Sequence, residues 1–250
     1  MSNHLVVEDR EGVRILIINR PEAKNALHSE LRRDLGSAFR DANRDKAVRV
    51  IVLTAVDPVF SAGVDFKEAG GGGGAAGPTD NPATVLRSIR KPVICAVNGA
   101  CVSGALEMAL SATFIVASER ARFADTHARL GVVPTWGLTA LLPRAIGFRK
   151  AREMSMTGSF VDADEALRVG LVNHLVDHGQ LLPFALSLAA AVPSSPAIAE
   201  VLELYRRGED LSIAGALASE AAFSADRTYD LAAFAAAGSA TSARQRGEDR

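Results

Sequence analysis

The stretches Phe60-Ser61-Ala62-Gly63-Val64-Asp65 and Asn98-Gly99-Ala100-Cys101-Val102-Ser103-Gly104-Ala105-Leu106-Glu107 decide the fold of this chain. Each ends a strand-like apolar run with a turn of small residues. Glycine in such a turn lets another group approach the main chain closely. Two turns of this kind brought together can direct two backbone N–H groups at one oxygen, which is what stabilisation of an oxyanion requires. The second turn also opens a predicted helix that carries the ionisable side chain of Glu107.

The segments around these turns alternate between strand and helix signals. Residues 29–43 place apolar side chains at helical spacing among charges, which predicts an amphipathic helix. Residues 106–110 are typical of a buried helix segment. Short apolar runs predict strands of a parallel or mixed sheet, buried where they are continuous, at 13–19, 48–55, 92–97 and 113–117. This alternation predicts an α/β fold.

The composition changes beyond about Pro193, where alanine-rich helices are predicted at 195–207, 211–223 and 228–237. The polar tail after Gly238 is predicted to be disordered. We therefore expect a core over residues 1–192 and a C-terminal helical region with a disordered tail over 193–250. The glycine-rich segment 70–78 lacks the lysine of a phosphate-binding loop and is typical of a flexible surface connection.

Composition and charge exclude several classes of partner. The formal net charge of −1 over 250 residues gives no reason to expect nucleic acid or an anionic membrane. No apolar stretch approaches the roughly 20 residues that span a bilayer, and Met1-Ser2-Asn3-His4 does not resemble a signal peptide, so we expect a cytoplasmic protein. Cys95 and Cys101 are predicted to be small buried hydrophobes. No group of His, Cys and carboxylates has zinc-ligand spacing, so no metal is predicted.

Four motifs occur together in one order. They are Asn19-Arg20-Pro21-Glu22-Ala23-Lys24-Asn25-Ala26-Leu27, the Phe60–Asp65 run, Lys91-Pro92-Val93-Ile94-Cys95-Ala96-Val97-Asn98-Gly99, and Thr157-Gly158-Ser159 followed by Asp164-Glu165-Ala166-Leu167-Arg168-Val169-Gly170-Leu171-Val172. With them the chain resembles the enoyl-CoA hydratase/isomerase (crotonase) superfamily from about Val6 to about Val176. The resemblance implies a spiral of repeated ββα units. It also implies C-terminal helices that pack against neighbouring subunits in a homotrimer or a dimer of trimers.

The resemblance also implies a set of catalytic groups. The backbone N–H groups of Val64 and Gly104 would form the oxyanion hole that holds the thioester carbonyl oxygen. Glu107 matches the first catalytic glutamate of the hydratases, which takes a proton from water as it adds to C3. The position of the second glutamate falls on His127, which could deliver the proton to C2 or could only shape or block the pocket. Asp125 would lie on the same side if this piece is extended, and could orient the ring.

Binding residues follow from the same resemblance. Candidate partners of the coenzyme A phosphates are Lys24 and Lys67, with Arg20 as a weaker one; the alternative is that they are solvated surface charges. Trp136 and Phe66 are candidates for the acyl pocket, and Trp136 could instead be a core or subunit contact. The segment 70–78 could also serve as a mobile lid over that pocket.

The resemblance therefore implies an enoyl-CoA hydratase-like enzyme of fatty acid metabolism, which adds water across a 2-enoyl-CoA through a stabilised thioester enolate. The coenzyme A thioester is the substrate, and no cofactor is expected. Two alternatives stay open: another reaction of the superfamily on an acyl-CoA (isomerase, hydrolase or decarboxylase), and a non-catalytic acyl-CoA binder. The retained Glu107 and the two turns argue against a pure binder, which would need neither. The sequence does not determine the acyl chain.

Overall fold

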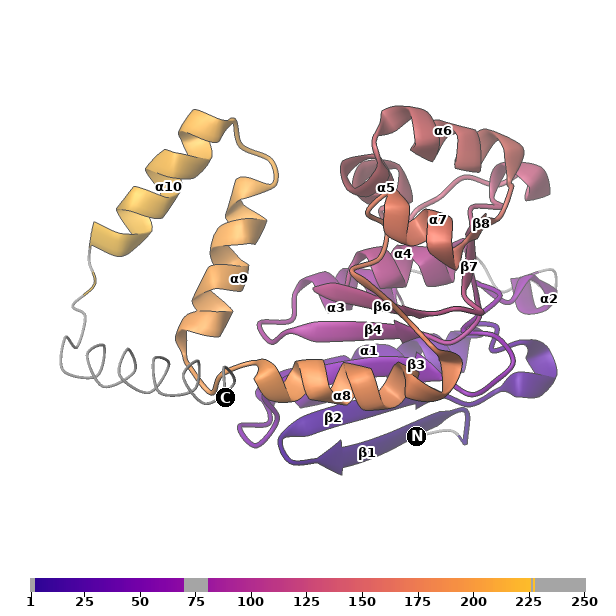
Figure 1. Ribbon diagram of the computed structural model, residues 1–250, viewed down its shortest axis with the longest axis horizontal. Helices are drawn as coiled ribbons and strands as arrows, with labels where there is room; N and C mark the ends of the chain where they lie inside the picture. Colours follow the sequence, from indigo (N-terminus) through magenta and orange to yellow (C-terminus); the bar gives the residue numbers. More distant parts are fainter. Residues whose placement is uncertain (1–2, 70–80, 226, 228–250) are drawn as a thin grey trace, which may run out of the picture. The chain divides into compact units, whose positions relative to one another are not determined.

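The structure, a computed structural model, describes residues 3–69, 81–225 and 227 (Figure 1). The glycine-rich segment 70–78, the predicted helix 228–237 and the tail after Gly238 lie outside the described residues. The chain divides into two compact units, Met1–Glu200 and Val201–Arg250. All the candidate site residues named above lie in the first unit.

Two sheets form the framework of the first unit. The larger has the strand order β1-β2-β3-β4-β6-β9, in which β1 and β2 are an antiparallel hairpin and the other neighbours are parallel. Its strands are β1 (Leu5–Arg10), β2 (Val13–Ile18), β3 (Val50–Ala55), β4 (Val93–Val97), β6 (Phe114–Ser118) and β9 (His174–Val176). The smaller sheet has the order β5-β7-β8, with β5 (Ala100–Val102), β7 (Arg122–Ala124) and β8 (Val161–Asp162).

Successive strands are joined by helices in a recurring order. The sequences β1–β2–α1, β4–β5–α4 and β6–β7–α5 each pass through two strands and then a helix, which confirms the implied spiral of ββα units. The helices of the first unit are α1 (Ser29–Arg44), α2 (Phe66–Ala69), α3 (Pro82–Arg87), α4 (Gly104–Leu110), α5 (Leu138–Ile146), α6 (Phe148–Thr157), α7 (Ala163–Arg168) and α8 (Leu181–Ala191). Helix α9 (Ala197–Gly208) begins in this unit, and α10 (Ile213–Ala225) belongs to the second. The predicted strands and helices that fall on described residues are confirmed with bounds that differ by at most two residues.

Both faces of the large sheet are buried, because alternate side chains of a strand point to opposite faces. In β2, Val13 and Ile15 join a core cluster with α8, whereas Leu16 and Ile18 join the cluster that includes α1, α3 and α4. Figure 1 shows α8 lying across the first of these faces. Because both faces of the sheet are buried, the central strands are continuous apolar runs in the sequence.

Two further expectations from the sequence concern the cysteines and membrane-spanning helices. Cys95 and Cys101 are free and buried, as predicted, and burial raises the pKa of both thiols far above the ordinary value. Among the helices that the structure describes, none is both long and apolar enough to cross a membrane.

Asn25 ties together the loops that leave β2 and β3. Its side chain is fully buried, and its Nδ2 donates to the carbonyl oxygens of Val56 at 2.8 Å and Val59 at 2.7 Å. Its Oδ1 accepts the N–H of Arg20 at 2.8 Å. The φ of 53° is one that asparagine adopts more readily than most residues. This clasp fixes the path of the chain into the Phe60 stretch.

We predict that Asn25→Ala lowers the free energy of unfolding by about 2–4 kcal/mol, because it removes a fully buried side chain and leaves two half-buried carbonyls and one N–H without their partner. Urea unfolding followed by circular dichroism measures this. The matched control is Asn19→Ala, since the Asn19 side chain makes one exposed hydrogen bond of 3.4 Å and should change stability by only about 0.5 kcal/mol or less. Equal losses in the two variants would contradict the role of Asn25.

Candidate active site

The two turns are joined in register by a short parallel pairing of their backbones. Ser61 and Cys101 form an isolated bridge. The Ser61 N–H donates to Ala100 O at 3.0 Å, and the Val102 N–H donates to Ser61 O at 3.1 Å. Val64 lies three residues beyond Ser61, and Gly104 lies three residues beyond Cys101. Because the two segments run parallel from this pairing, Val64 and Gly104 occupy equivalent positions along them.

The backbone N–H groups of Val64 and Gly104 are left unused by the fold. On one side, Leu27 pairs with the first turn through Leu27 N to Gly63 O at 2.8 Å and Asp65 N to Leu27 O at 3.2 Å, so the intervening Val64 amide faces the other way. Gly104 is the first residue of α4, where an amide has no partner within the helix. Neither amide donates a hydrogen bond within the part of the chain that the structure describes. The two are thus available to an external oxygen.

Close approach of the turns depends on glycine at two positions. Gly63 has a φ of 90°, and a Cβ there would lie 2.7 Å from Val102 O. A Cβ on Gly104 would lie 3.2 Å from both Val64 Cγ2 and Trp136 Cζ3. Val64 and the Trp136 ring therefore pack directly against the start of α4. Trp136 is only 4% exposed, so its ring is a buried neighbour of this turn.

Ser103, whose role has no signal in the sequence, holds the second turn in an unusual conformation. Its φ of 50° and ψ of −110° are rare for a residue other than glycine. Three hydrogen bonds maintain it: Ser103 N donates to Ala124 O at 2.9 Å, and Ser103 Oγ accepts Thr126 N and pairs with Thr126 Oγ1, each at 2.9 Å. Strain held by several bonds is typical of functional turns. Here it sets the direction of the Gly104 amide.

Glu107 points inward from the first turn of α4 and is 1% exposed. Its Oε1 accepts the backbone N–H groups of Trp136 at 2.7 Å and Leu138 at 3.2 Å. Burial raises the pKa of Glu107, and this effect outweighs the opposite effect of the two N–H groups. The hydrogen bonds fix the carboxyl group by one oxygen, so Oε2 is the atom available for chemistry.

His127 is brought next to Glu107 and is oriented by Asp125. His127 Nδ1 lies 2.6 Å from Asp125 Oδ1, and His127 Nε2 lies 3.8 Å from Glu107 Oε2. Although burial acts to raise it, hydrogen bonds from His127 and Ser155 lower the pKa of Asp125, so its carboxylate accepts and Nδ1 carries the proton. The arrangement directs Nε2 at Glu107.

The Asp125–His127 contact arises from a turn and not from an extended strand, which corrects the geometry supposed from the sequence. Strand β7 ends at Ala124, and His127 has helical dihedrals of −55° and −52°. Asp125 Oδ1 also accepts the His127 N–H at 3.2 Å, closing a local turn of the kind that aspartate favours. Side chain and backbone of His127 are thus held by one carboxylate.

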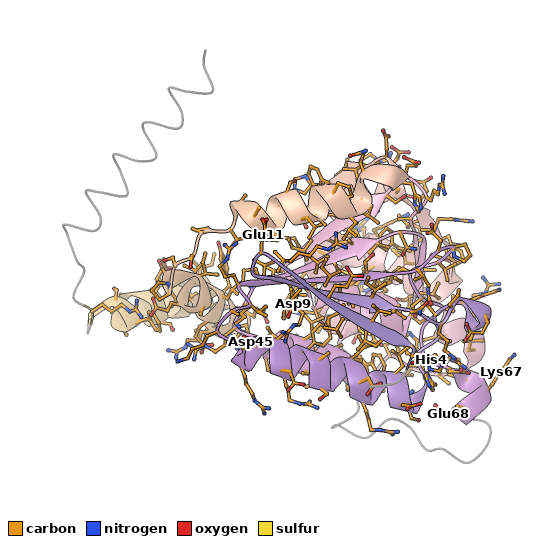
Figure 2. All side chains as sticks on the ribbon, turned by 90° about the horizontal axis from the view of Figure 1, so that it is seen from below. His4, Asp9, Glu11, Asp45, Lys67 and Glu68 are labelled. Atoms are coloured by element: carbon orange, nitrogen blue, oxygen red, sulfur yellow. The ribbon has the colours of Figure 1, made fainter. Side chains whose placement is uncertain are left out.

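The candidate binding residues differ in how far they are engaged. The Arg20 guanidinium donates to Asp65 at 2.6 Å, and this bond helps to hold the pKa of Asp65 below its ordinary value. Arg20 therefore fastens the first turn, and its contact with coenzyme A stays a prediction. Lys24 and Lys67 are exposed, as Figure 2 shows for Lys67. Phe66 is 43% exposed, beside Lys67 in α2.

We predict that Glu107→Gln makes the fold more stable at pH 8. A carboxyl group whose pKa is raised by folding binds its proton more tightly in the folded state, so its ionisation destabilises the fold as the pH rises through the folded pKa. Glutamine keeps an Oε1 acceptor for Trp136 N and Leu138 N but carries no charge. The expected rise in Tm is on the order of a few degrees at pH 8 and vanishes below about pH 4.

Differential scanning fluorimetry across this pH range measures the effect. Glu153→Gln is the control, because Glu153 is an exposed glutamate on α6 whose replacement should leave the pH dependence of Tm unchanged. A lower Tm for Glu107→Gln at pH 8 would show that the carboxylate is a net stabiliser, contrary to the expectation.

Comparisons with known proteins agree with this geometry. The family profile described as enoyl-CoA hydratase/isomerase matches residues 8–225. The chain is 38% identical to the probable enoyl-CoA hydratase 1, peroxisomal, of Arabidopsis thaliana over 77% of this chain and 74% of that protein. It is 36% identical to the carnitinyl-CoA dehydratase of Proteus mirabilis over 85% of this chain and 84% of that protein.

The fold agrees as well. The crystal structure of an enoyl-CoA hydratase from Mycobacterium tuberculosis matches with a TM-score of 0.77 and 42% identity, over 88% of this chain and 97% of that one. Sequence and structure lead to one conclusion: the chain belongs to the enoyl-CoA hydratase/isomerase family.

Proposed function

We propose that this protein hydrates 2-enoyl-CoA thioesters to 3-hydroxyacyl-CoA. The observation that carries the proposal is the approach of two proton-transfer groups, Glu107 Oε2 and His127 Nε2, to 3.8 Å in a buried site beside the free amides of Val64 and Gly104. Hydration needs a base for water, a donor for carbon and an anion-stabilising pair of amides. In the proposal, Glu107 is the base, His127 is the donor, and Val64 and Gly104 are the pair of amides.

In the first step the thioester carbonyl oxygen accepts the Val64 and Gly104 N–H groups. Glu107 Oε2 takes a proton from water while the water oxygen forms a bond to C3, and the electrons of the C2–C3 double bond move toward the carbonyl. Negative charge then develops on the oxygen held by the two amides. Removal of one such donor typically costs about 3–4 kcal/mol in the barrier.

In the second step the enolate collapses and C2 takes a proton from His127 Nε2. The enzyme is then left with a protonated Glu107 and a neutral His127. Transfer of the Glu107 proton to Nε2 across the 3.8 Å separation restores both groups. The sum of the steps is the addition of one water molecule, and the same path in reverse is a dehydration.

Asp125 acts through His127 as a positioning residue. Its carboxylate fixes the ring through Nδ1 and is the counter-ion of the protonated imidazole that the second step requires. Its own environment keeps it ionised, since hydrogen bonds from His127 and Ser155 offset its burial. In the proposed mechanism, the Asp125–His127 pair is what allows a histidine to act as the proton donor.

Substrate binding is assigned to groups around the hole. Trp136 and Phe66 would contact the acyl chain, and Lys24 and Lys67 would meet the phosphates of coenzyme A, with Arg20 as a secondary candidate. In support, Trp136 packs against Gly104, and both lysines are exposed. The cytoplasmic location, the absence of a cofactor and the place in fatty acid metabolism stay predictions from the sequence.

We predict that the protein hydrates crotonyl-CoA. The loss of the enoyl thioester absorbance measures the rate of this reaction. Glu107→Gln and His127→Ala should each lower kcat about a hundredfold or more, because each removes a proton-transfer group. Asp125→Asn should lower kcat by about tenfold.

The matched control is His174→Ala, since His174 packs on Phe184 and lies outside the site. Its kcat should stay close to that of the wild type. Wild type that binds crotonyl-CoA and does not hydrate it would refute the proposal. Shift of the double bond in a 3-enoyl-CoA, without hydration of crotonyl-CoA, would assign the chain to the isomerase alternative.

We also propose that the chain assembles with copies of itself as a homotrimer or a dimer of trimers. In support, α9 and α10 have no buried residue, and the second unit exposes large apolar side chains at Val201, Tyr205, Leu211, Ile213 and Leu217. Large apolar patches on a protein surface usually mark a site where another protein binds. The family resemblance implies that a second copy of the chain covers these apolar side chains.

We predict that light scattering coupled to size exclusion gives the mass of three or six chains of 26.3 kDa. Ile213→Asp with Leu217→Asp should shift the mass toward one chain, because two charges would enter an apolar interface. Glu220→Gln, on the same helix, is the control. A monomeric wild type would refute the assembly and leave the hydratase proposal intact.

A further inference from the structure

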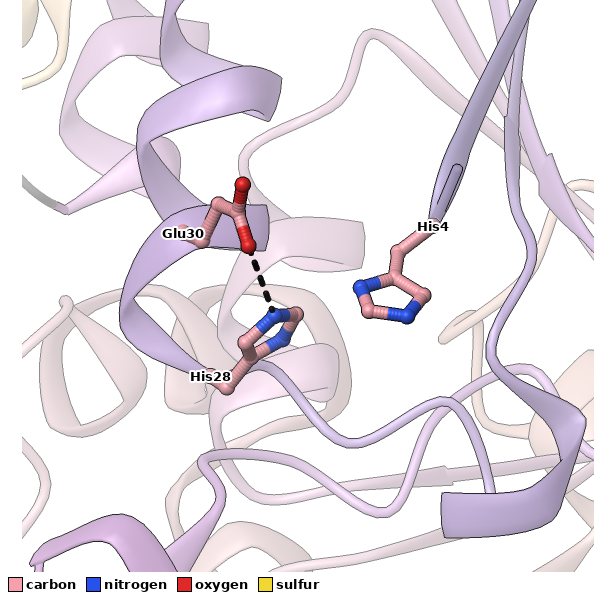
Figure 3. Close-up of side chains that lie close together, drawn as sticks. All are labelled: His4, His28 and Glu30. Atoms are coloured by element: carbon pink, nitrogen blue, oxygen red, sulfur yellow. Dashed lines mark ion pairs between the residues drawn. The ribbon is translucent and has the colours of Figure 1, made fainter. Parts of the chain in front are cut away.

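Two histidines from distant parts of the chain meet at the surface of the first unit. His4 directly precedes β1, and His28 is the N-cap residue of α1. Their rings meet edge to face, with centroids 4.9 Å apart and an interplanar angle of 73° (Figure 3). The Nδ1 atoms of both rings are buried, and neither has a hydrogen-bond partner. A buried polar atom without a partner is rare in folded proteins and points to a bound ligand that would satisfy it.

A carboxylate completes the cluster. Glu30, in the first turn of α1, places Oε2 3.7 Å from His28 Nε2, which is too long for a hydrogen bond (Figure 3). One ligand atom from each of His4, His28 and Glu30 lies within 4.8 Å of the other two. Ligands of one tetrahedral zinc ion lie about 3.3 Å apart, so the separations need to contract by at most about 1.5 Å. Glu30 is exposed and its side chain is free to make that adjustment.

We propose that His4, His28 and Glu30 bind a zinc ion that fastens the start of β1 to the start of α1. Two imidazoles and one carboxylate are a donor set that zinc accepts, with water at the fourth position. Backbone N–H of Asn19 already donates to His4 O at 2.8 Å, so the His4 backbone is held in place before an ion arrives.

Charges of both signs lie close to the cluster. The Glu68 carboxylate accepts the N–H of Ser29 at 2.7 Å, which places a second negative charge beside His28. Figure 2 shows His4 and Glu68 at the same end of the molecule. The nearby positive charge of Arg20 is paired with Asp65 at 2.6 Å. The sequence does not reveal this site, because its ligands come from segments without zinc-ligand spacing.

Calorimetric titration of the full chain, without a histidine tag and after removal of metals with a chelator, tests the proposal. Zinc chloride should bind with one ion per chain. At free zinc about a hundredfold above Kd, the Tm should rise by roughly 5–10 °C. Magnesium chloride should produce neither effect, since Mg²⁺ prefers oxygen ligands in an octahedral site.

Variants assign the ligands and separate this site from the active site. His4→Gln and His28→Gln should each weaken zinc binding at least about tenfold, while crotonyl-CoA hydration stays within about twofold of the wild type. His127→Gln is the reciprocal control, expected to lose hydration and keep zinc affinity. Circular dichroism confirms folding of each variant, and His4→Gln alone suffices if His28→Gln does not fold.

The outcomes that overturn the proposal are specific. Wild type that binds no zinc refutes it, and so does zinc binding that survives both His4→Gln and His28→Gln. Zinc affinity that is lost in His127→Gln and kept in His28→Gln would place the ion in the active site. None of these results depends on whether the protein hydrates crotonyl-CoA.

Discussion

The backbone pairing between Ser61 and Cys101 is the constraint on which the rest of the site depends. Two hydrogen bonds of 3.0 and 3.1 Å set the two turns in register, and the free amides of Val64 and Gly104 follow from that register by equal spacing. The Asn25 clasp and the Arg20–Asp65 pair hold the first turn, and Ser103 holds the second. Because main-chain groups do this work, most side chains of the turns serve only to let the backbones approach.

Two carboxyl groups of the site, those of Glu107 and Asp125, are buried, and each is held by hydrogen-bond donors. Glu107 is buried with Oε1 held by two backbone amides, while Oε2 faces His127 Nε2 at 3.8 Å. Asp125 is buried with three donors and stays ionised. The pKa shifts of these two carboxyl groups go in opposite directions, although both groups lie close to one imidazole. In the mechanism proposed above, this difference suits Glu107 to accept a proton from water and Asp125 to remain a fixed counter-ion.

Much of this arrangement was predictable from local sequence, and the remainder depends on contacts between distant segments. Strand and helix positions follow from apolar periodicity, and the turns follow from their small residues, as at Gly63 and Gly104. The hydrogen bonds from Trp136 and Leu138 to Glu107 were not predictable, because they join backbone amides to a side chain of another element. The strained Ser103 has no sequence signal, since serine rarely adopts that conformation. The Asp125–His127 contact was anticipated with the wrong backbone geometry.

The hydrogen bond from Trp136 N to Glu107 Oε1 links the position of the tryptophan to the orientation of the carboxyl group. The residue whose ring packs against the start of α4 also holds the Glu107 carboxyl group through its main chain. Under the mechanism proposed above, an acyl group that displaces the Trp136 ring would also turn Glu107 away from the water that it activates. Substrate selection by size would then appear as slower turnover of bound thioesters, more than as weaker binding. In such an enzyme, widening the pocket without loosening the base requires a change in the tryptophan ring alone.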